Sequence, residues 1–373
     1  MPEVVPQPPN PLLLPYETGH LRLRNRIAMA PMTRGRADDT TAVPSPLTRT
    51  YYAQRAGAGL IVTEGLWPHP LGKGGPGIPG LVTDEHVAAW REVTRAVHAE
   101  GGRIFAQLWH VGRMTHPVTL PDGELPVAPS AVRITGEPIF TRDGPLDHVT
   151  PRPLATAEAE AVIAAFAAEA RNAIRAGFDG VEVHGANGYL LQQFLAENTN
   201  LRTDRFGGSR NGRLRLVVEV VEAIAAEIGP ERVGLRISPD NPENEIAEED
   251  PQGTYRALAG ALAPLGLAYL HVIERGAYGA LADLRPLWPG TLIANFNGPE
   301  PTTRRAGEEV LEAGLADLFS FGRLFISNPD LPARFAAGAP LNRHAEHLVY
   351  GGGAEGYTDY PALEAPTAEG ART

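Results

Sequence analysis

Eight short apolar runs recur along the chain, and this repetition constrains the fold more than any other feature of the sequence. Each run has the length of a β-strand, is rich in strand-forming residues and is closed by polar or turn residues. The runs occupy residues 25–32, 59–65, 103–109, 180–185, 232–238, 268–273, 291–296 and 317–322.

Helical patterns separate most of these runs. Residues 157–176 carry an apolar face and stop at Gly177, and residues 84–100 and 212–228 show a similar pattern. The segment 300–314 begins with Pro and Thr and ends in Gly, as a helix after the seventh strand should. The alternation predicts an α/β protein with a closed parallel (β/α)8 TIM barrel. A doubly wound open sheet is the alternative, but no G-x-G-x-x-G follows the first run.

Two segments interrupt the alternation. Residues 110–153 are rich in Pro, Gly and Thr, and we expect a lid or hairpin insertion after strand three. The tail from about 340 holds three tyrosines, so we expect it to dock on the barrel as far as about Tyr360. We therefore expect a single domain over residues 1–362, with 363–373 as a flexible tail.

The composition excludes several classes of function. The net charge of -11 argues against binding to nucleic acid or to an anionic membrane. The absence of cysteine excludes disulfides and thiolate chemistry, and together with the lack of a signal peptide it favours a cytoplasmic protein. No apolar run is long enough for a transmembrane helix. Lys73 is the only lysine and lies in a Gly/Pro-rich segment, where a Schiff-base lysine is not expected.

Polar side chains or a glycine stand at the ends of five predicted strands. The carboxyl ends of barrel strands meet at one mouth, where active sites of this fold lie. The residues concerned are Thr33, Gly65, Gln107, His184 with Asn187 and Tyr189 just beyond it, and Arg236. The loop that follows Arg236, residues 238–250, is acidic; we expect solvated surface there, with only its beginning at the rim of the mouth.

Arg236 is the most informative of these residues because its strand is otherwise made of Val, Leu and Ile. A buried cation is costly unless it is paired. It can pair with Asp or Glu, or it can face an electron-rich ligand such as a flavin ring. Gln107 and Thr33 could then meet the polar edge of that ring, although each alone is more simply a satisfied core residue.

The ends of strands seven and eight suggest a phosphate site. Gly322 permits close approach of a ligand to the backbone, and Arg323 supplies a charge that can bind phosphate. Backbone N–H groups after these two strands form the recurrent phosphate site of such barrels. The alternative is a Gly-Arg turn with a solvated arginine.

Six motifs in order resemble the Old Yellow Enzyme family of FMN-dependent ene-reductases. They are APMTR, FAQLWHVGR, HGANGYLLQQFL, NLRTDRFGGS, FGRLFISNPDL and GYTDYP, and the match runs from about residue 10 to 362. The resemblance implies a barrel with non-covalent FMN and NAD(P)H as reductant, NADPH being slightly favoured. It implies reduction of activated C=C bonds in enones, enals and maleimides, with nitroalkenes as an extension. It also implies an enzyme of the NADPH dehydrogenase or N-ethylmaleimide reductase type.

The resemblance also assigns roles to residues. His184 and Asn187 would hold the substrate carbonyl, and Tyr189 would donate the proton. Trp109 and Tyr357 would line the substrate pocket. Thr33, with the His-x-x-Asn pair, places the chain in the branch similar to the yeast and enterobacterial enzymes. FMN would contact Pro31, Met32, Thr33, Gly65, Gln107, Arg236, Ala294, Asn295, Phe296, Gly322 and Arg323.

Some positions depart from the family's pattern, and two other functions stay open. Ala294 stands where the family usually has Gly, and Asn211-Gly212 replaces Glu-Asn before Arg213. One alternative is a barrel isomerase or aldolase acting on a phosphorylated substrate without flavin. The other is a flavin-binding protein without turnover. The expected partner is a small molecule, with no metal; the sequence does not decide between a monomer and a homo-oligomer.

Overall fold

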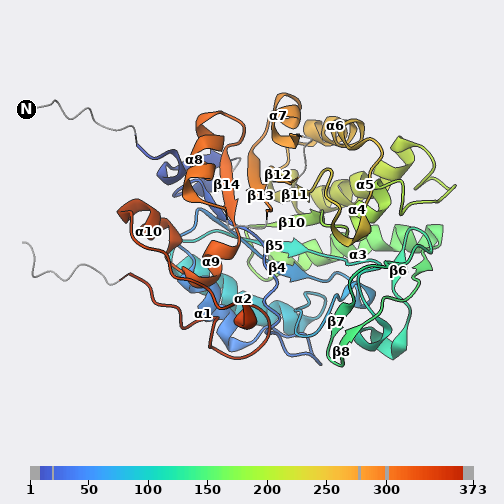
Figure 1. Ribbon diagram of the computed structural model, residues 1–373, viewed down its shortest axis with the longest axis horizontal. Coiled ribbons are helices and arrows are strands. Elements are labelled where there is room, and N and C mark those ends of the chain that lie inside the picture. The colour runs from blue at the N-terminus through green and yellow to red at the C-terminus, as the bar shows by residue number, and fades with distance from the viewer. Residues whose placement is uncertain (1–8, 19–20, 276–278, 299–301, 364–373) are drawn as a thin grey trace, which may run out of the picture.

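Eight parallel strands form a closed barrel in the computed structural model, which describes residues 9–18, 21–275, 279–298 and 302–363 (Figure 1). Around the barrel the strands follow the order β10-β11-β12-β13-β14-β3-β4-β5. They are β3 (Ile27–Met29), β4 (Leu60–Leu66), β5 (Ile104–Leu108), β10 (Gly180–Gly185), β11 (Val233–Ile237), β12 (Tyr269–Glu274), β13 (Leu292–Phe296) and β14 (Leu318–Phe321). Each strand coincides with one of the eight apolar runs. The predicted barrel is confirmed and the open sheet is wrong.

Helices surround the strands (Figure 1). The predicted helices appear as α2, α3, α5 and α8, and their starts are capped where the sequence offers an acceptor. The Thr83 hydroxyl accepts the His86 N–H at 3.1 Å, and the Ser209 hydroxyl accepts the Gly212 N–H at 3.1 Å. The helices are α1 (Pro46–Gln54), α2 (Asp84–Ala99), α3 (Thr156–Arg175), α4 (Leu190–Leu195), α5 (Arg210–Ile228), α6 (Pro251–Leu262), α7 (Ala280–Leu284), α8 (Arg304–Glu312), α9 (Arg323–Ser327) and α10 (Leu331–Ala337).

The lower part of the barrel interior is apolar. Its side chains, such as Phe105, Ile293 and Leu318, pack against Leu21 and Leu23 of the N-terminal hairpin, which comprises β1 (Tyr16–Thr18) and β2 (Leu21–Leu23). The hairpin therefore closes the end of the barrel opposite the mouth. The sequence did not predict it, because two strands of three residues carry too little periodicity.

A buried polar chain lies above this apolar part. Gln107 Nε2 donates to Glu182 Oε1 at 2.9 Å, and the ring of His271 bridges Glu182 Oε2 and Ser320 Oγ at 2.8 Å each. Burial alone would raise the pKa of Glu182, but His271, Arg236 and Gln107 together lower it below its usual value. Glu182 is therefore a carboxylate, and it can only accept hydrogen bonds.

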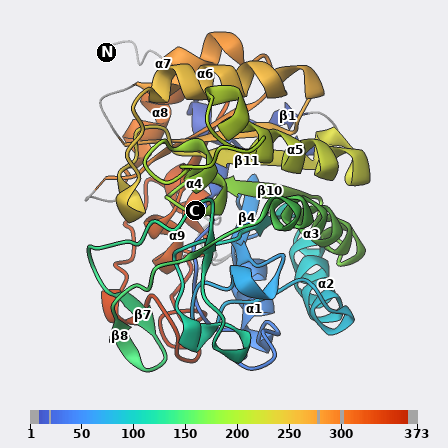
Figure 2. The same ribbon diagram turned by 90° about the vertical axis from the view of Figure 1, so that its right-hand side faces the viewer.

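The insertion after β5 forms a small annex beside the barrel (Figure 2). It contains the 3-10 turns Pro117–Thr119 and Pro121–Gly123 and two two-stranded sheets. In one sheet β6 (Val127–Ala128) runs parallel to β9 (Arg152–Pro153); in the other β7 (Ile139–Thr141) and β8 (Gly144–Leu146) form an antiparallel hairpin. Residues 110–153 thus contain a hairpin, and their action as a lid stays a prediction.

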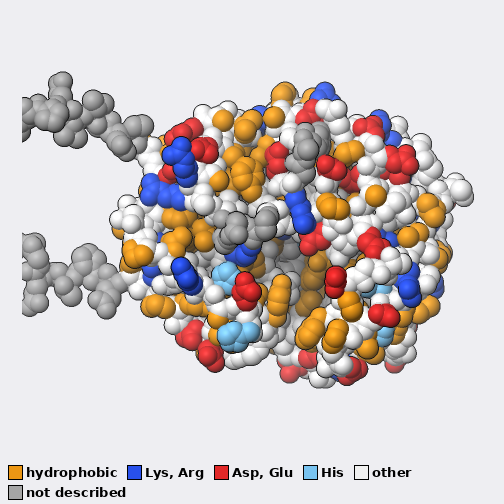
Figure 3. Space-filling view, in the orientation of Figure 1, with side chains coloured by type: hydrophobic (Ala, Val, Ile, Leu, Met, Phe, Trp, Pro, Cys, Tyr) orange, Lys and Arg blue, Asp and Glu red, His pale blue; other side chains and the backbone are white. Residues whose placement is uncertain are grey.

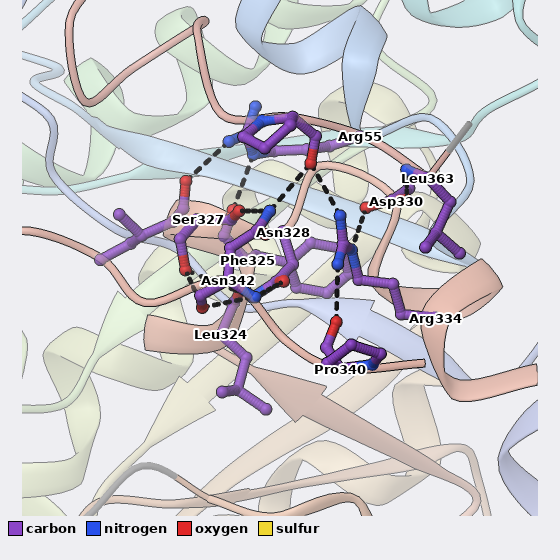
Figure 4. Close-up of polar contacts among 12 residues, drawn as sticks. Arg55, Leu324, Phe325, Ser327, Asn328, Asp330, Arg334, Pro340, Asn342 and Leu363 are labelled. Carbon is purple, nitrogen blue, oxygen red and sulfur yellow. Dashed lines mark hydrogen bonds and ion pairs between the residues drawn. The ribbon is translucent and has the colours of Figure 1, made fainter. Parts of the chain in front are cut away.

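The C-terminal segment 340–363 docks on α9 and α10 (Figure 4). The amide of Asn328 accepts the Asn342 N–H at 2.7 Å, and Asp330 accepts the Leu363 N–H at 2.6 Å. Arg334 donates to the carbonyls of Pro340 and Pro361 at 2.6 Å and 2.7 Å. The chain beyond α10 is held at both ends of this segment, as the tyrosine content of the tail predicts.

Basic and acidic side chains are interspersed over the face shown in Figure 3. Within the described ranges, no helix is both long enough and apolar enough to cross a membrane.

Candidate active site

A cavity of about 500 Å³ opens where strands β3, β10, β11, β13 and β14 end. Nine residues that the sequence assigns to the site line this cavity, from widely separated parts of the chain. They are Pro31, Met32, Thr33, Asn187, Arg236, Asn295, Phe296, Gly322 and Arg323. The barrel therefore assembles most of the predicted site at one place.

Arg236 forms a buried cationic wall of the cavity. Its side chain is 6% exposed, and Nη2 donates to Asn295 Oδ1 at 3.1 Å. Its Nε is buried and has no hydrogen-bond partner among the described residues, and none of them forms an ion pair with it. Burial lowers the pKa of Arg236, with Glu182 opposing the shift. The alternative of a simple pairing with Asp or Glu is therefore wrong, and an N–H group is left for a ligand.

Gly322 and Arg323 also line the cavity, where β14 passes into α9. The space that a Gly322 side chain would occupy is bordered by Met32 Sδ at 3.6 Å, so no neighbour blocks the backbone there. Arg323 donates to the carbonyl of Gly298. Residues 299–301, at the start of the predicted helix segment, lie outside the described residues. An open backbone and a guanidinium thus lie side by side, as a phosphate group requires.

His184 stands beside Arg236 on the neighbouring strand, paired with it in register. The Ala186 N–H points at His184 Nδ1 at 3.3 Å, so Nδ1 is an acceptor and Nε2 carries the proton. Burial lowers the pKa of His184 well below its usual value, and the charges of Arg236 and His271 lower it further. His184 is therefore a neutral imidazole that donates from Nε2.

Tyr189 packs edge-on against two rings. Its ring centroid lies 4.9 Å from that of Trp109 at 81° and 5.0 Å from that of His184 at 79°. Burial raises the pKa of Tyr189, and Glu243 and Tyr350 raise it further. The phenol therefore keeps its proton. His184, Tyr189 and Trp109 form a ring cluster next to Asn187 rather than part of the cavity wall itself.

A strained turn carries Asn187 between His184 and Tyr189. Asn187 and Gly188 both have positive φ, of 54° and 74°. Two buried amides from α4 brace the turn: Gln192 Oε1 accepts the Gly188 N–H at 2.8 Å, and Gln193 Nε2 donates to the Gly188 carbonyl at 2.8 Å. Sequence reasoning missed both glutamines. Their signal was available, since two amides stand in an otherwise apolar helix.

Tyr357 does not line the cavity, so its predicted role is wrong. It is fully buried and stacks on Tyr51 with ring centroids 4.2 Å apart, and the guanidinium of Arg36 lies over its ring at 4.4 Å. Tyr350, seven positions earlier in the same docked segment, lines the cavity instead. The docking of the segment decides which tyrosine faces the ligand.

Ala294 also lies elsewhere than predicted. It is buried within β13, packs in the hydrophobic core, and its carbonyl accepts the Ser320 hydroxyl at 3.2 Å. The two residues that follow it, Asn295 and Phe296, reach the cavity. Its methyl group therefore has no part in the cavity wall.

Gly65 and Gly212 have steric roles that the motifs did not indicate. A side chain at Gly65 would meet Trp109 Cε3 at 2.3 Å, so the glycine makes room for the indole. A side chain at Gly212 would meet the Gly207 carbonyl oxygen at 2.1 Å, so the glycine lets α5 begin against the loop that contains Gly207. Gly65 and Gln107 do not line the cavity, and their contact with a ligand stays a prediction.

A second cavity of about 970 Å³ continues from the first. The two share Thr33, Glu346 and Tyr350. The second cavity extends to Phe140 at the hairpin β7–β8, which is 72% exposed. The mouth is thus wider than the space among the strand ends.

Comparison with known proteins agrees with this geometry. The chain matches the NADH:flavin oxidoreductase / NADH oxidase family over residues 11–342. It is 41% identical to putative 12-oxophytodienoate reductase 4 of Oryza sativa subsp. japonica, covering 97% of this chain and 96% of that protein. It is 39% identical to 12-oxophytodienoate reductase 2 of Arabidopsis thaliana, covering 95% and 96%.

Solved structures give the same result. Morphinone reductase in complex with tetrahydroNAD superposes with a TM-score of 0.90 at 43% identity, covering 97% of this chain and 99% of that one. The Old Yellow Enzyme homologue of Zymomonas mobilis has a TM-score of 0.89 at 39% identity, covering 94% and 99%. The chain therefore belongs to the Old Yellow Enzyme family of oxidoreductases, with FMN as its cofactor and NAD(P)H as its reductant.

Proposed function

We propose that the protein reduces the activated C=C bond of α,β-unsaturated carbonyl compounds. One observation carries the proposal: the end of β10 and the turn after it place a neutral imidazole N–H, an amide and a protonated phenol beside a cavity with a buried cation. Two donors and one proton source are what the reduction of an enone requires. The resemblance supports enones, enals, maleimides and nitroalkenes as the substrate class.

The residues present fit FMN in this cavity. The unpartnered Nε of Arg236 suits the negative edge of a flavin ring, and Thr33, in the segment after β3, can donate to its carbonyl edge. Gln107 gives one N–H of its Nε2 to the Glu182 carboxylate, so its other N–H and its oxygen are left for the polar edge of the ring. Gly322 and Arg323 would hold the phosphate. When bound, FMN would supply the hydride chemistry that links NAD(P)H to the β-carbon of the alkene.

The side chains at the end of β10 and in the turn after it would stabilise the developing charge and supply the proton. His184 Nε2–H and the Asn187 amide donate to the substrate carbonyl oxygen and stabilise the negative charge that develops there. Preorganised donors of this kind contribute on the order of 3 kcal/mol each. Tyr189 gives its proton to the α-carbon, a contribution of roughly 10²–10⁴-fold. Hydride and proton together yield the saturated carbonyl compound and NAD(P)⁺.

Replacement of Tyr189 tests this assignment. Tyr189→Phe should keep FMN and accept electrons from NAD(P)H, because its ring packing is preserved. Its reoxidation by cyclohexenone without oxygen should slow by roughly 10²–10⁴-fold, because no acid protonates the α-carbon. Stopped-flow absorbance of the flavin follows both half-reactions separately. Reduction of cyclohexenone at the wild-type rate would show that Tyr189 is not the proton donor.

The two alternative functions are no longer equally supported. Membership of a flavin oxidoreductase family removes the isomerase or aldolase, and Lys73 pairs with Asp39 at 2.9 Å and does not line the cavity. A flavin protein without turnover predicts a reduced flavin that enones do not reoxidise. The NADPH preference, the N-ethylmaleimide reductase type, the threonine branch and the cytoplasmic location stay proposals from the sequence.

A further inference from the structure

We propose that Asn241, in the loop after β11, orients the side-chain amide of Asn187 so that its N–H group faces the substrate carbonyl. Asn241 is a positioning residue in this account, since it acts only through Asn187. The inference rests on the proposed function, because it presumes that Asn187 binds the substrate oxygen.

Asn241 is placed for this role. It is 1% exposed, although it lies in the polar loop that composition marks as solvated surface. Its Nδ2 donates to Asn187 Oδ1 at 3.1 Å. The two side chains thus meet amide to amide at the rim of the cavity that Asn187 lines.

The direction of this hydrogen bond follows from two groups that can only donate. The oxygen and nitrogen of an amide are interchangeable in shape, so only the surrounding hydrogen bonds decide which way it points. Asn241 Oδ1 accepts the Glu243 backbone N–H at 3.2 Å and Arg275 Nη1 at 3.2 Å. An N–H and a guanidinium have no acceptor, so the oxygen of Asn241 must face them and its NH₂ must face Asn187.

The same logic then fixes Asn187. An NH₂ group at Asn241 requires an oxygen opposite it, so Asn187 Oδ1 faces Asn241 and its NH₂ is directed to the ligand. In the reversed orientation, two N–H groups would oppose each other at Asn241. A carbonyl substrate would then meet the oxygen of Asn187 and lose a donor.

The backbone of Asn187 is held independently of its amide. Its N–H donates to Ser238 Oγ at 2.8 Å, and its carbonyl accepts Asn244 Nδ2 at 2.7 Å. Neither contact depends on which way the side-chain amide points. Asn241 therefore controls the flip of the amide, while Ser238 and Asn244 control the position of the residue.

Two substitutions separate orientation from mere packing. Asn241→Asp has the same shape but presents only acceptors, so Asn187 should turn its NH₂ toward the introduced carboxylate and its oxygen toward the substrate. Asn241→Ala removes the side chain and leaves the amide without an imposed orientation. The holoenzyme, reduced and kept free of oxygen, is mixed with cyclohexenone, whose neutrality avoids repulsion by the new charge. The limiting rate constant and the half-saturating concentration are obtained separately.

The expected order is wild type, then Asn241→Ala, then Asn241→Asp as the slowest. The measured quantity is the ratio of the limiting rate constant to the half-saturating concentration. This ratio should fall about tenfold in the alanine variant and on the order of 100-fold in the aspartate variant. FMN content and its absorbance spectrum should match the wild type in both, because neither change touches the residues assigned to FMN. A packing role predicts the opposite order, since alanine removes more contacts than aspartate. That order would overturn the inference.

A double-variant cycle completes the test. Asn187→Ala should slow enone reduction, and adding Asn241→Asp or Asn241→Ala to it should cause no further loss. Further loss in the Asn187→Ala background would overturn the inference. If Asn187→Ala is slow but both Asn241 variants have wild-type kinetics, the inference about Asn241 is overturned and the proposed function is left intact. Wild-type kinetics for Asn187→Ala would overturn both. The cycle with Asn241→Ala stands by itself if the aspartate variant does not fold.

Discussion

At the scale of single residues, the chemistry depends on where protons sit on buried groups. Burial keeps His184 neutral and Tyr189 protonated, while Glu182 is kept ionised by its own partners. Each state fixes whether the group donates or accepts. Under the proposed function, two N–H donors and one O–H group are therefore available over the ordinary range of pH.

Glu64 allows a prediction about pH at the same scale. It lies within β4, its Oε2 accepts the Arg34 N–H at 3.1 Å, and burial raises its pKa to about 7. Its pKa is thus higher in the folded than in the unfolded protein, so the folded protein holds the proton more tightly. This contribution to stability is fully present below about pH 4.5 and is lost as the pH rises to about 7.

Glu64→Gln should remove that dependence. Relative to the variant, the wild type should lose about 3 kcal/mol of unfolding free energy between about pH 5 and about pH 8. Denaturant unfolding of both proteins at the two pH values gives this difference. The contributions of other titrating groups cancel, because both proteins contain them. An equal difference at both pH values would show that Glu64 does not titrate in this range.

At the scale of elements, the mouth is completed by a segment that belongs to no barrel repeat. Residues 340–363 carry Tyr350 to the cavity, and Arg334 holds this segment through Pro340 and Pro361. Arg334, whose side chain is 6% exposed, also pairs at 2.7 Å with Asp330, the N-cap residue of α10. One buried guanidinium thus contacts the segment near both of its ends.

Arg334→Ala should loosen this segment. Loss of the buried cation leaves Asp330 without its ion-pair partner and removes one donor each from the carbonyls of Pro340 and Pro361, which costs about 3 kcal/mol. Limited proteolysis should then cut near residue 340 faster than in the wild type. Arg305→Ala is the matched control, because Arg305 forms the same spacing of ion pair with Glu309 but its side chain is 84% exposed. Equal cleavage of the two variants would contradict this account of the docking.

The elements differ in how far the sequence could predict them. Strand positions follow from local apolar runs, and so the eight barrel strands were found. The cavity-facing tyrosine could not be found this way, because the docking of the tail and not local pattern places Tyr350 rather than Tyr357. Asn241 was hidden for a similar reason: its partner Asn187 lies 54 positions away, and the loop composition suggests only solvation.

At the scale of the whole molecule, the barrel divides into an apolar plug, a polar layer and a mouth. The N-terminal hairpin closes one end, the chain from Gln107 to Ser320 crosses the middle, and the ligand cavity lies at the other end. This order gives buried donors at the mouth a rigid and dry support. Under the proposed function, hydride and proton arrive from different sources, the coenzyme and Tyr189.

Isotope labelling of the product tests this division of labour most directly. Cyclohexenone is reduced with NAD(P)H that carries deuterium at both C4 positions in ordinary water, and separately with unlabelled coenzyme in D₂O. We expect cyclohexanone with deuterium on the β-carbon in the first case and on the α-carbon in the second. Deuterium on the carbonyl carbon, or no reduced product from a protein whose flavin is reduced, would contradict the proposed division.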